Sequence, residues 1–85
     1  SSGIAIFPNP VTDNFSIYIP KSFGLFEMKL YDISGKLIYS LNGEPNSSDI
    51  IHISKSEADL RYGMYLLQII SEQGIVENMK LIVID

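Results

Sequence analysis

Apolar and polar residues alternate along this chain in short stretches, with the period of two that is typical of a strand with one buried face. In residues 14–19 every second residue is Phe or Ile, and in residues 25–32 Phe, Met and Leu recur in the same way. Further strands are predicted at 3–7, 36–41, 50–54, 64–71 and 74–84. About seven strands at intervals of roughly 8 to 12 residues predict an all-β antiparallel sandwich.

The connections between the predicted strands carry turn-forming residues. In "DISG", Asp32 and Gly35 predict a type I turn followed by a bulge with glycine at positive φ. The "EQG" of residues 72–74 is short enough for a second hairpin. Residues 42–49 are expected to hold neither helix nor strand, and residues 55–63 to form one brief helical turn that ends at Gly63.

Length and charge narrow the class of protein. With 85 residues the chain fits one domain, expected over 4–85, with 1–3 set apart as a linker or an expression scar. The net charge of −4 would repel a phosphate backbone, so nucleic acid is not an expected partner. There is no cysteine, and no apolar run approaches the roughly 20 residues that span a bilayer, so neither a disulfide nor a transmembrane segment is expected.

Residues that could carry out catalysis or bind a metal are few. His52 is the single histidine, and its place between two isoleucines of a predicted strand directs its side chain toward water. No nucleophile elbow surrounds any serine, so no enzyme activity is expected. Zinc would need more His or Cys ligands than the chain has, and no cofactor is predicted. Five acids in or beside turns could approach a calcium ion without EF-hand spacing, although solvated turn residues are the plainer interpretation: Asp13, Asp32, Asp49, Glu57 and Asp59.

The five tyrosines allow two interpretations. They could stack on sugars or peptides, but tyrosines at alternate strand positions more often pack on a sandwich face. The residues in question are Tyr18, Tyr31, Tyr39, Tyr62 and Tyr65.

Four stretches in fixed order resemble a known family: "FPNPVTDNFSI", "LYDISGKLI", "LRYGMYLLQI" and "KLIVID". They are similar to the type A C-terminal sorting domain of the type IX secretion system, also called the Por secretion system. The resemblance covers the chain from Ile4 onward. It implies an immunoglobulin-like β-sandwich of about seven strands that lies at the C-terminus of a larger secreted protein and is not catalytic.

The resemblance also implies partners and a destination. A cargo protein fused on the N-terminal side would reach the periplasm with a signal peptide of its own, and the outer-membrane translocon would then recognise the folded domain. A surface sortase would remove the domain at a point upstream of Ser1 or close to it, and would join the cargo to lipopolysaccharide. The protein would be secreted or displayed on the cell surface, with the isolated domain monomeric.

The signal residues carried over from the family fall on Pro8, Asn9, Pro10, Asp13, Asp32, Gly35, Lys36, Gly63, Tyr65, Lys80, Leu81, Ile82 and Val83. Each also has a structural explanation, since proline and glycine shape turns and alternate strand residues pack in cores. The chain ends on Asp85 where many members end on a basic residue. Residues 79–84 are expected to be the main docking element, through unpaired backbone groups at a sheet edge.

Two other functions stay open on the sequence. One is an adhesive or carbohydrate-binding immunoglobulin-like module that acts while attached to its cargo, and an exposed aromatic platform or a convergent acidic ion site would favour it. The other is a domain that only stabilises its neighbour in the chain.

Overall fold

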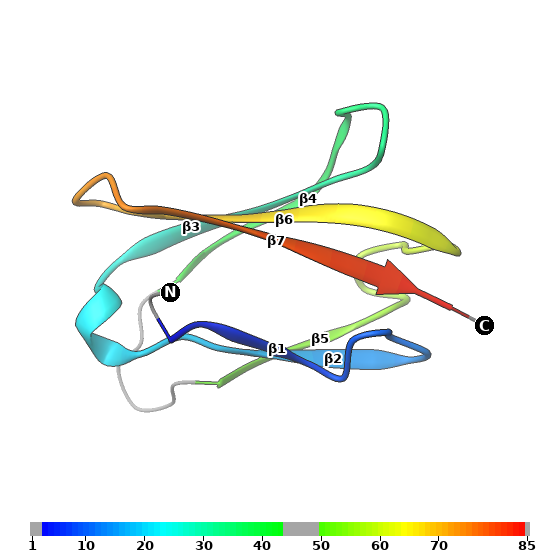
Figure 1. Ribbon diagram of the computed structural model, residues 1–85, viewed down its shortest axis with the longest axis horizontal. Coiled ribbons are helices and arrows are strands. Elements are labelled where there is room, and N and C mark those ends of the chain that lie inside the picture. The colour runs from blue at the N-terminus through cyan, green and yellow to red at the C-terminus, as the bar shows by residue number, and fades with distance from the viewer. Residues whose placement is uncertain (1–2, 44–49, 85) are drawn as a thin grey trace.

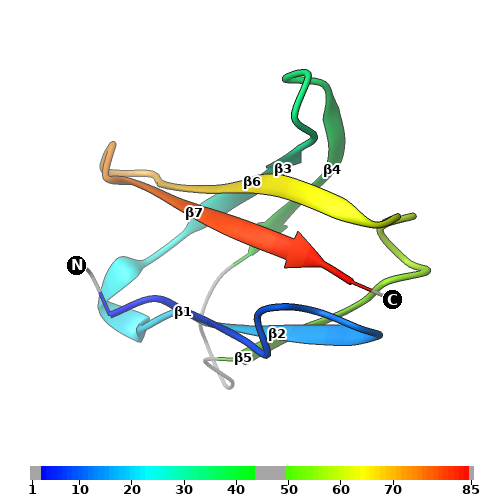
Figure 2. The same cartoon turned by 45° about the vertical axis from the view of Figure 1, so that its right-hand side comes forward.

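The computed structural model describes residues 3–43 and 50–84, which form two antiparallel sheets packed face to face (Figure 1). The smaller sheet has the strand order β1-β2-β5, with bounds Ala5–Phe7, Asn14–Tyr18 and Ile50–Ser54. The larger sheet has the order β4-β3-β6-β7, with bounds Leu37–Gly43, Phe26–Tyr31, Gly63–Ser71 and Val76–Val83. The chain crosses between the sheets after β2, β4 and β5, and the turned view keeps the two layers distinct (Figure 2). The prediction of an all-β sandwich with about seven strands is confirmed.

The alternating residues of the sequence form one core between the sheets. In β2, β3 and β6 every second side chain is buried, and the intervening ones face outward. The buried cluster also includes residues from loops, because a sheet of only three strands leaves part of the larger sheet to be covered. Its members are Val11, Phe15, Ile17, Ile19, Phe23, Phe26, Met28, Leu30, Ile53, Ala58, Leu60, Tyr65, Leu67, Ile69, Leu81 and Val83.

Two elements differ from the prediction. The 3-10 helix Lys21–Phe23 was not expected, and it forms where Phe23 turns into the core between β2 and β3. The fourth strand continues to Gly43, so assigning residues 42 and 43 to a loop is wrong. They pair with Glu27 and Phe26 of β3, which extends the ladder. The remainder of that predicted loop, Asp49 included, lies outside the described residues, as do Ser1 and Asp85.

The predicted helical turn is shorter than expected. Residues 55–59 form a turn that ends at Asp59, which has φ 53°. A reciprocal pair begins it, in which the Glu57 amide donates to Ser54 Oγ (2.9 Å) and the Ser54 amide donates to Glu57 Oε1 (3.4 Å). Leu60 is then drawn into the core, so the chain cannot continue as a helix, and Gly63 begins β6 instead of ending the turn.

Both hairpins of the larger sheet use the same turn. In residues 32–36 the Gly35 amide donates to the Asp32 carbonyl (3.0 Å), and in residues 71–75 the Gly74 amide donates to the Ser71 carbonyl (3.0 Å). Both glycines have positive φ, 88° and 91°, which confirms the predicted turn at Asp32. Within the described ranges no helix is long and apolar enough to cross a membrane.

Candidate functional site

The four motifs of the sequence lie at one end of the sandwich, which we call the motif end: residues 8–13, 31–37, 61–66 and 80–84. Strand register brings them together, because Tyr31 pairs with Leu37 and Leu66, and Val83 pairs with Gly63. Val11 forms an isolated parallel bridge to Val83. In Figure 1 the loop after β1, the start of β6 and the C-terminal end of β7 all lie toward the right.

Asn9 joins the first motif to the last one. Its Nδ2 donates to the Lys80 carbonyl (2.9 Å), and its Oδ1 accepts from the Ile82 amide (3.0 Å). The amide side chain thus presents one donor and one acceptor to β7, as a strand residue would. Pro8 and Pro10 on either side have no amide hydrogen to offer, and the peptide bonds before both are cis.

Val11 continues this contact along the outer edge of β7. Its amide donates to the Ile82 carbonyl (2.7 Å), and its carbonyl accepts from the Ile84 amide (2.8 Å). Its side chain is fully buried, so the contact has an apolar anchor as well as hydrogen bonds. Residues 79–84 were expected to offer an open edge, and this expectation is wrong for residues 80–84. The Lys80 carbonyl, the Ile82 amide and carbonyl and the Ile84 amide are already bonded to Asn9 and Val11.

The terminal strand divides its side chains between two environments. Leu81 and Val83 are buried in the core, whereas Lys80 is exposed and Ile82 is half-buried on the outer face. Of the four predicted signal residues of this strand, two therefore pack in the core and two lie on the outer face. Only Lys80 and Ile82 can meet another molecule without unfolding the domain.

The turn of residues 32–36 is held by one carboxylate. Asp32 Oδ1 accepts hydrogen bonds from the Ser34 amide (2.9 Å), the Ser34 hydroxyl (2.7 Å) and the Lys36 amide (3.0 Å). The bond from the Ser34 hydroxyl, followed by that from the Lys36 amide, lowers the pKa of Asp32. Gly35 supplies the positive φ, while Lys36 is exposed. Asp32 and Gly35 thus shape the turn from which the side chain of Lys36 projects.

Tyr65 builds a corner at the start of β6. Its hydroxyl donates to the Arg61 carbonyl (2.9 Å) and accepts from the Arg61 amide (3.0 Å), while its ring is buried. This is the tyrosine corner of immunoglobulin-like sandwiches, which fixes the approach to the strand. Gly63, with φ 137°, provides a backbone conformation that other residues rarely adopt.

Asp13 lies in an exposed loop that is tied to the end of β5. The Asp13 carbonyl accepts from the Lys55 amide (2.8 Å), and the Thr12 carbonyl accepts from Lys55 Nζ (3.2 Å). The turn acids do not gather around a common point: in the described part of the chain, no three His, Asp or Glu side chains are placed to hold a metal ion.

His52 and the tyrosines follow the sequence analysis in part. His52 is exposed, as predicted, and its Nδ1 lies 2.8 Å from the Ser16 hydroxyl on the neighbouring strand. Tyr65 packs in the core, but Tyr62 is 66% exposed, so the prediction of packing is wrong for Tyr62. Tyr39 is half-buried and donates to Glu57 Oε2 (3.0 Å), and burial together with this bond raises its pKa.

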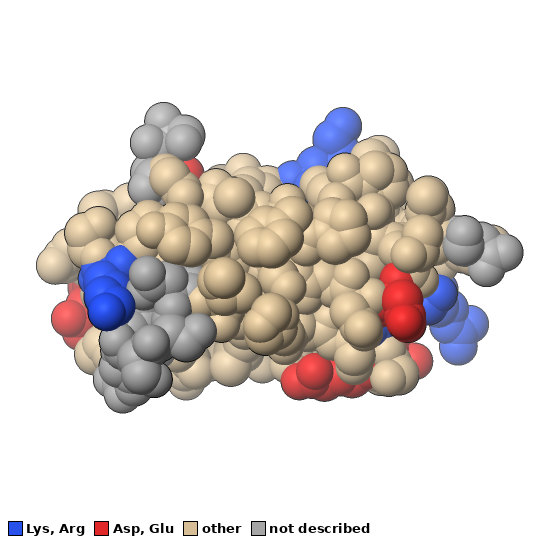
Figure 3. Space-filling model, turned by 90° about the horizontal axis from the view of Figure 1, so that it is seen from below, with Lys and Arg blue, Asp and Glu red and all other residues tan. Residues whose placement is uncertain are grey.

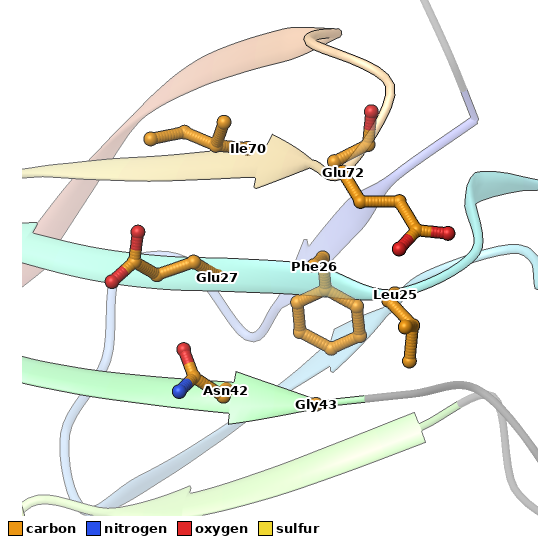
Figure 4. Close-up of a pocket in the computed structure, with 8 residues that line it drawn as sticks. Leu25, Phe26, Glu27, Asn42, Gly43, Ile70 and Glu72 are labelled. Carbon is orange, nitrogen blue, oxygen red and sulfur yellow. The ribbon is translucent and has the colours of Figure 1, made fainter.

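A hollow of about 350 Å³ lies at the opposite end of the larger sheet (Figure 4). It is lined by Leu25, Phe26, Glu27, Asn42, Gly43, Ile70, Ser71 and Glu72, none of which belongs to the motif end. The lining is mainly apolar with two carboxylates.

Sequence reasoning missed the contacts that join the motif end. The contact of Asn9 with β7 spans 71 and 73 residues of chain, and no local pattern reports it. Val11 lies within the first motif but is not among the predicted signal residues. The pairing of Ser54 with Glu57 could have been found, since "SKSE" is a capping-box sequence.

Comparison with known proteins gives three similarities. The family model described as "Secretion system C-terminal sorting domain" matches residues 5–84. An endo-acting ulvan lyase of Formosa agariphila is 31% identical over 85 residues, which are 98% of this chain and 15% of the lyase. A solved structure of PorZ, a surface component of the type IX secretion system of Porphyromonas gingivalis, superposes with a TM-score of 0.74 at 18% identity. It covers 98% of this chain and 12% of PorZ, and it bears out the fold.

Proposed function

This chain belongs to the family of secretion system C-terminal sorting domains, and from that premise we propose that it directs one attached cargo protein across the outer membrane. Membership identifies it as a sorting domain of the type IX system, in a protein that is secreted or displayed at the cell surface. The family is not catalytic. An enzyme activity of the whole protein would belong to another part of it, as in the ulvan lyase, of which this chain matches only 15%.

One structural observation supports the proposal. The motif residues, which are spread over most of the sequence, come together at one end of a folded sandwich, where Asn9 binds the strand of the last motif. A sorting signal that is recognised in the folded domain needs such a composite surface, whereas a linear sequence signal does not. The residues proposed to matter for recognition are therefore those of the motif end.

The finer steps of the pathway are also proposals. We place the cargo on the N-terminal side of residue 4, with a surface sortase that cleaves near Ser1 and joins the cargo to lipopolysaccharide. The translocon and the sortase would be the partners, and the isolated domain would be monomeric.

A fused reporter tests the proposed function. A fluorescent or enzymatic reporter carrying a periplasmic signal peptide and these 85 residues at its C-terminus would be expressed in a type IX-competent host. We expect surface reporter there, and periplasmic reporter in the same host without the translocon. Equal display in both hosts would contradict the proposal. Mass spectrometry of the displayed reporter in sortase-positive and sortase-negative strains tests cleavage separately.

The carbohydrate-binding alternative rests on the outer face of the smaller sheet. Register places Phe7, Ser16 and His52 in one row across this face and Tyr18 in the next, and Phe7 is 44% exposed. Figure 3 shows this face with charged side chains only toward its margins. Saturable binding on a glycan array that is lost with Phe7→Ala and Tyr18→Ala would favour this function.

A further inference from the structure

We propose, on the basis of the function above, that the secretion machinery reads a face of the larger sheet rather than an edge. The docking face is defined by the outward side chains of Tyr31, Leu37, Met64, Leu66, Lys80 and Ile82. The partner is a protein surface of the secretion machinery that is apolar and carries a carboxylate opposite Lys80.

The edge of the terminal strand is closed to a β-augmenting partner over residues 80–84. Residues 80–84 already bond outward to Asn9 and Val11, through four hydrogen bonds of 2.7 to 3.0 Å. A partner strand would have to displace the buried Val11 before it could pair there. Since the Lys80 carbonyl, both backbone groups of Ile82 and the Ile84 amide are occupied, side chains are the main groups that this stretch can offer to a partner.

Strand register brings the docking face together from all four strands. Leu37, Tyr31, Leu66 and Lys80 form one row across β4, β3, β6 and β7, because each is paired with the next. Met64 and Ile82 form the adjoining row. A register shift between Leu30 and Tyr31 puts Leu37 opposite Tyr31, which adds Leu37 to the row on this face.

The docking face is apolar and open. Leu37, Met64 and Leu66 are 46%, 49% and 44% exposed, and each projects from a strand whose other face packs in the core or against it. Contiguous exposed apolar groups on a small soluble domain mark an interaction surface. In Figure 2 the outer side of β3, β4 and β6 faces away from the other sheet.

Lys80 is the one charged residue among those that define the docking face. The outward positions of these four strands, all of them described, carry three charged side chains. Glu27 is paired with Lys29 at 3.7 Å, and Lys29 lies two residues along β3 from Tyr31, outside the docking face. Lys80 stands among the apolar residues, in a chain with a net charge of −4. A partner that combines apolar contacts with a carboxylate fits this arrangement.

The outer face of the smaller sheet does not offer the same combination. It is also poor in charge, as Figure 3 shows, but it contains no residue of the terminal strand. Lys80 and Ile82 are reached only from the larger sheet. Deleting residues 80–85 would not test this, because Leu81 and Val83 would leave the core with them. Substitutions at outward positions are needed.

Matched substitutions on the same face separate docking from folding. Leu66→Gln and Val76→Gln alter two side chains that are each 44% exposed and outward, the first in the docking face and the second at the far end of the sheet. Lys80→Glu reverses the charge, and Lys80→Arg keeps it. Each variant is made in the reporter fusion, and surface and periplasmic reporter are compared with the wild type after urea unfolding shows that the domain is folded.

We expect Leu66→Gln and Lys80→Glu to lower surface reporter by about tenfold or more, as loss of a central contact does. Val76→Gln and Lys80→Arg should stay within about twofold of the wild type, which is a small change on the affinity scale. Wild-type export from folded Leu66→Gln and Lys80→Glu overturns the docking face. A dimer in sedimentation that Leu66→Gln abolishes overturns it too, because the face would then bind a second copy. Failure of the wild-type fusion itself to reach the surface counts against the proposed function instead.

Discussion

At three positions in this domain a single side chain forms hydrogen bonds with backbone groups of another segment or turn. The Asn9 amide binds a carbonyl and an amide of β7, the Asp32 carboxylate caps a turn, and the Tyr65 hydroxyl binds the backbone amide and carbonyl of Arg61. Each belongs to a motif that is also expected to serve recognition. Stability measurements should therefore accompany any export assay of these positions.

Asn9→Ala removes both hydrogen bonds to β7. We expect it to lower the free energy of unfolding by about 1 kcal/mol, because the site is exposed and water partly replaces the lost bonds. Hydrogen exchange at the Ile82 amide should accelerate at the same time. Asn14→Ala, also an exposed asparagine, is the control. Unchanged protection of Ile82 in Asn9→Ala would show that the side chain does not hold β7 in solution.

The contribution of Asp32 to the free energy of unfolding should decrease as the pH falls. Its pKa is lowered in the folded state, so its contribution is fully present above the unfolded pKa and is lost as pH falls through the folded pKa. The stability difference between wild type and Asp32→Asn should shrink accordingly in acid. NMR titration should show the Asp32 pKa moving back up in Ser34→Ala, since the Ser34 hydroxyl is the largest cause. An unchanged pKa would contradict this assignment.

Gly43 is required by a neighbouring ring and not by its backbone. A Cβ at this position would lie 2.6 Å from Phe26 Cζ, and Figure 4 shows the ring directed toward Gly43. Gly43→Ala should cost about 1 to 3 kcal/mol in urea unfolding, as overpacking does. In a Phe26→Leu background the same change should cost less. Equal costs in the two backgrounds would exclude the ring as the cause.

At the scale of elements, the sequence predicted what depends on neighbours along the chain. Alternation identified β2, β3 and β6 because their buried faces repeat every second residue, and Asp32 with Gly35 identified the first hairpin. The extension of β4 to Gly43 depends on pairing with β3. The early end of the turn at Asp59 depends on burial of Leu60. Such tertiary effects leave no local pattern, and the joining of the motif end is of the same kind.

The corner at Tyr65 ties the loop before β6 to the strand. Tyr65→Phe keeps the buried ring but leaves the Arg61 amide and carbonyl without the hydroxyl. We expect a loss of about 1 to 2 kcal/mol in unfolding free energy. Tyr62→Phe, at a tyrosine that is 66% exposed, should have little effect. A loss of similar size in both variants would mean that the hydroxyl bonds at Tyr65 are not responsible.

On the scale of the whole molecule, one core links the two sheets. Among the described residues, those of both sheets and of the loops form a single buried cluster, so neither sheet has an independent core there. We expect one cooperative unfolding transition with a free energy on the order of 5 kcal/mol. Circular dichroism and tyrosine fluorescence should follow the same urea curve. Two separated transitions would show that the sheets unfold independently.

The contact between Asn9 and β7 has a consequence for the order of events in biosynthesis. Residue 9 emerges early, whether from a ribosome or from a membrane channel, but its partners lie 71 and 73 residues later. Closing so long a loop is slow compared with forming a hairpin, and it cannot begin until residues 80–84 have emerged. A partly synthesised domain thus lacks the assembled motif end. The sorting signal can therefore form only after the last strand has been synthesised.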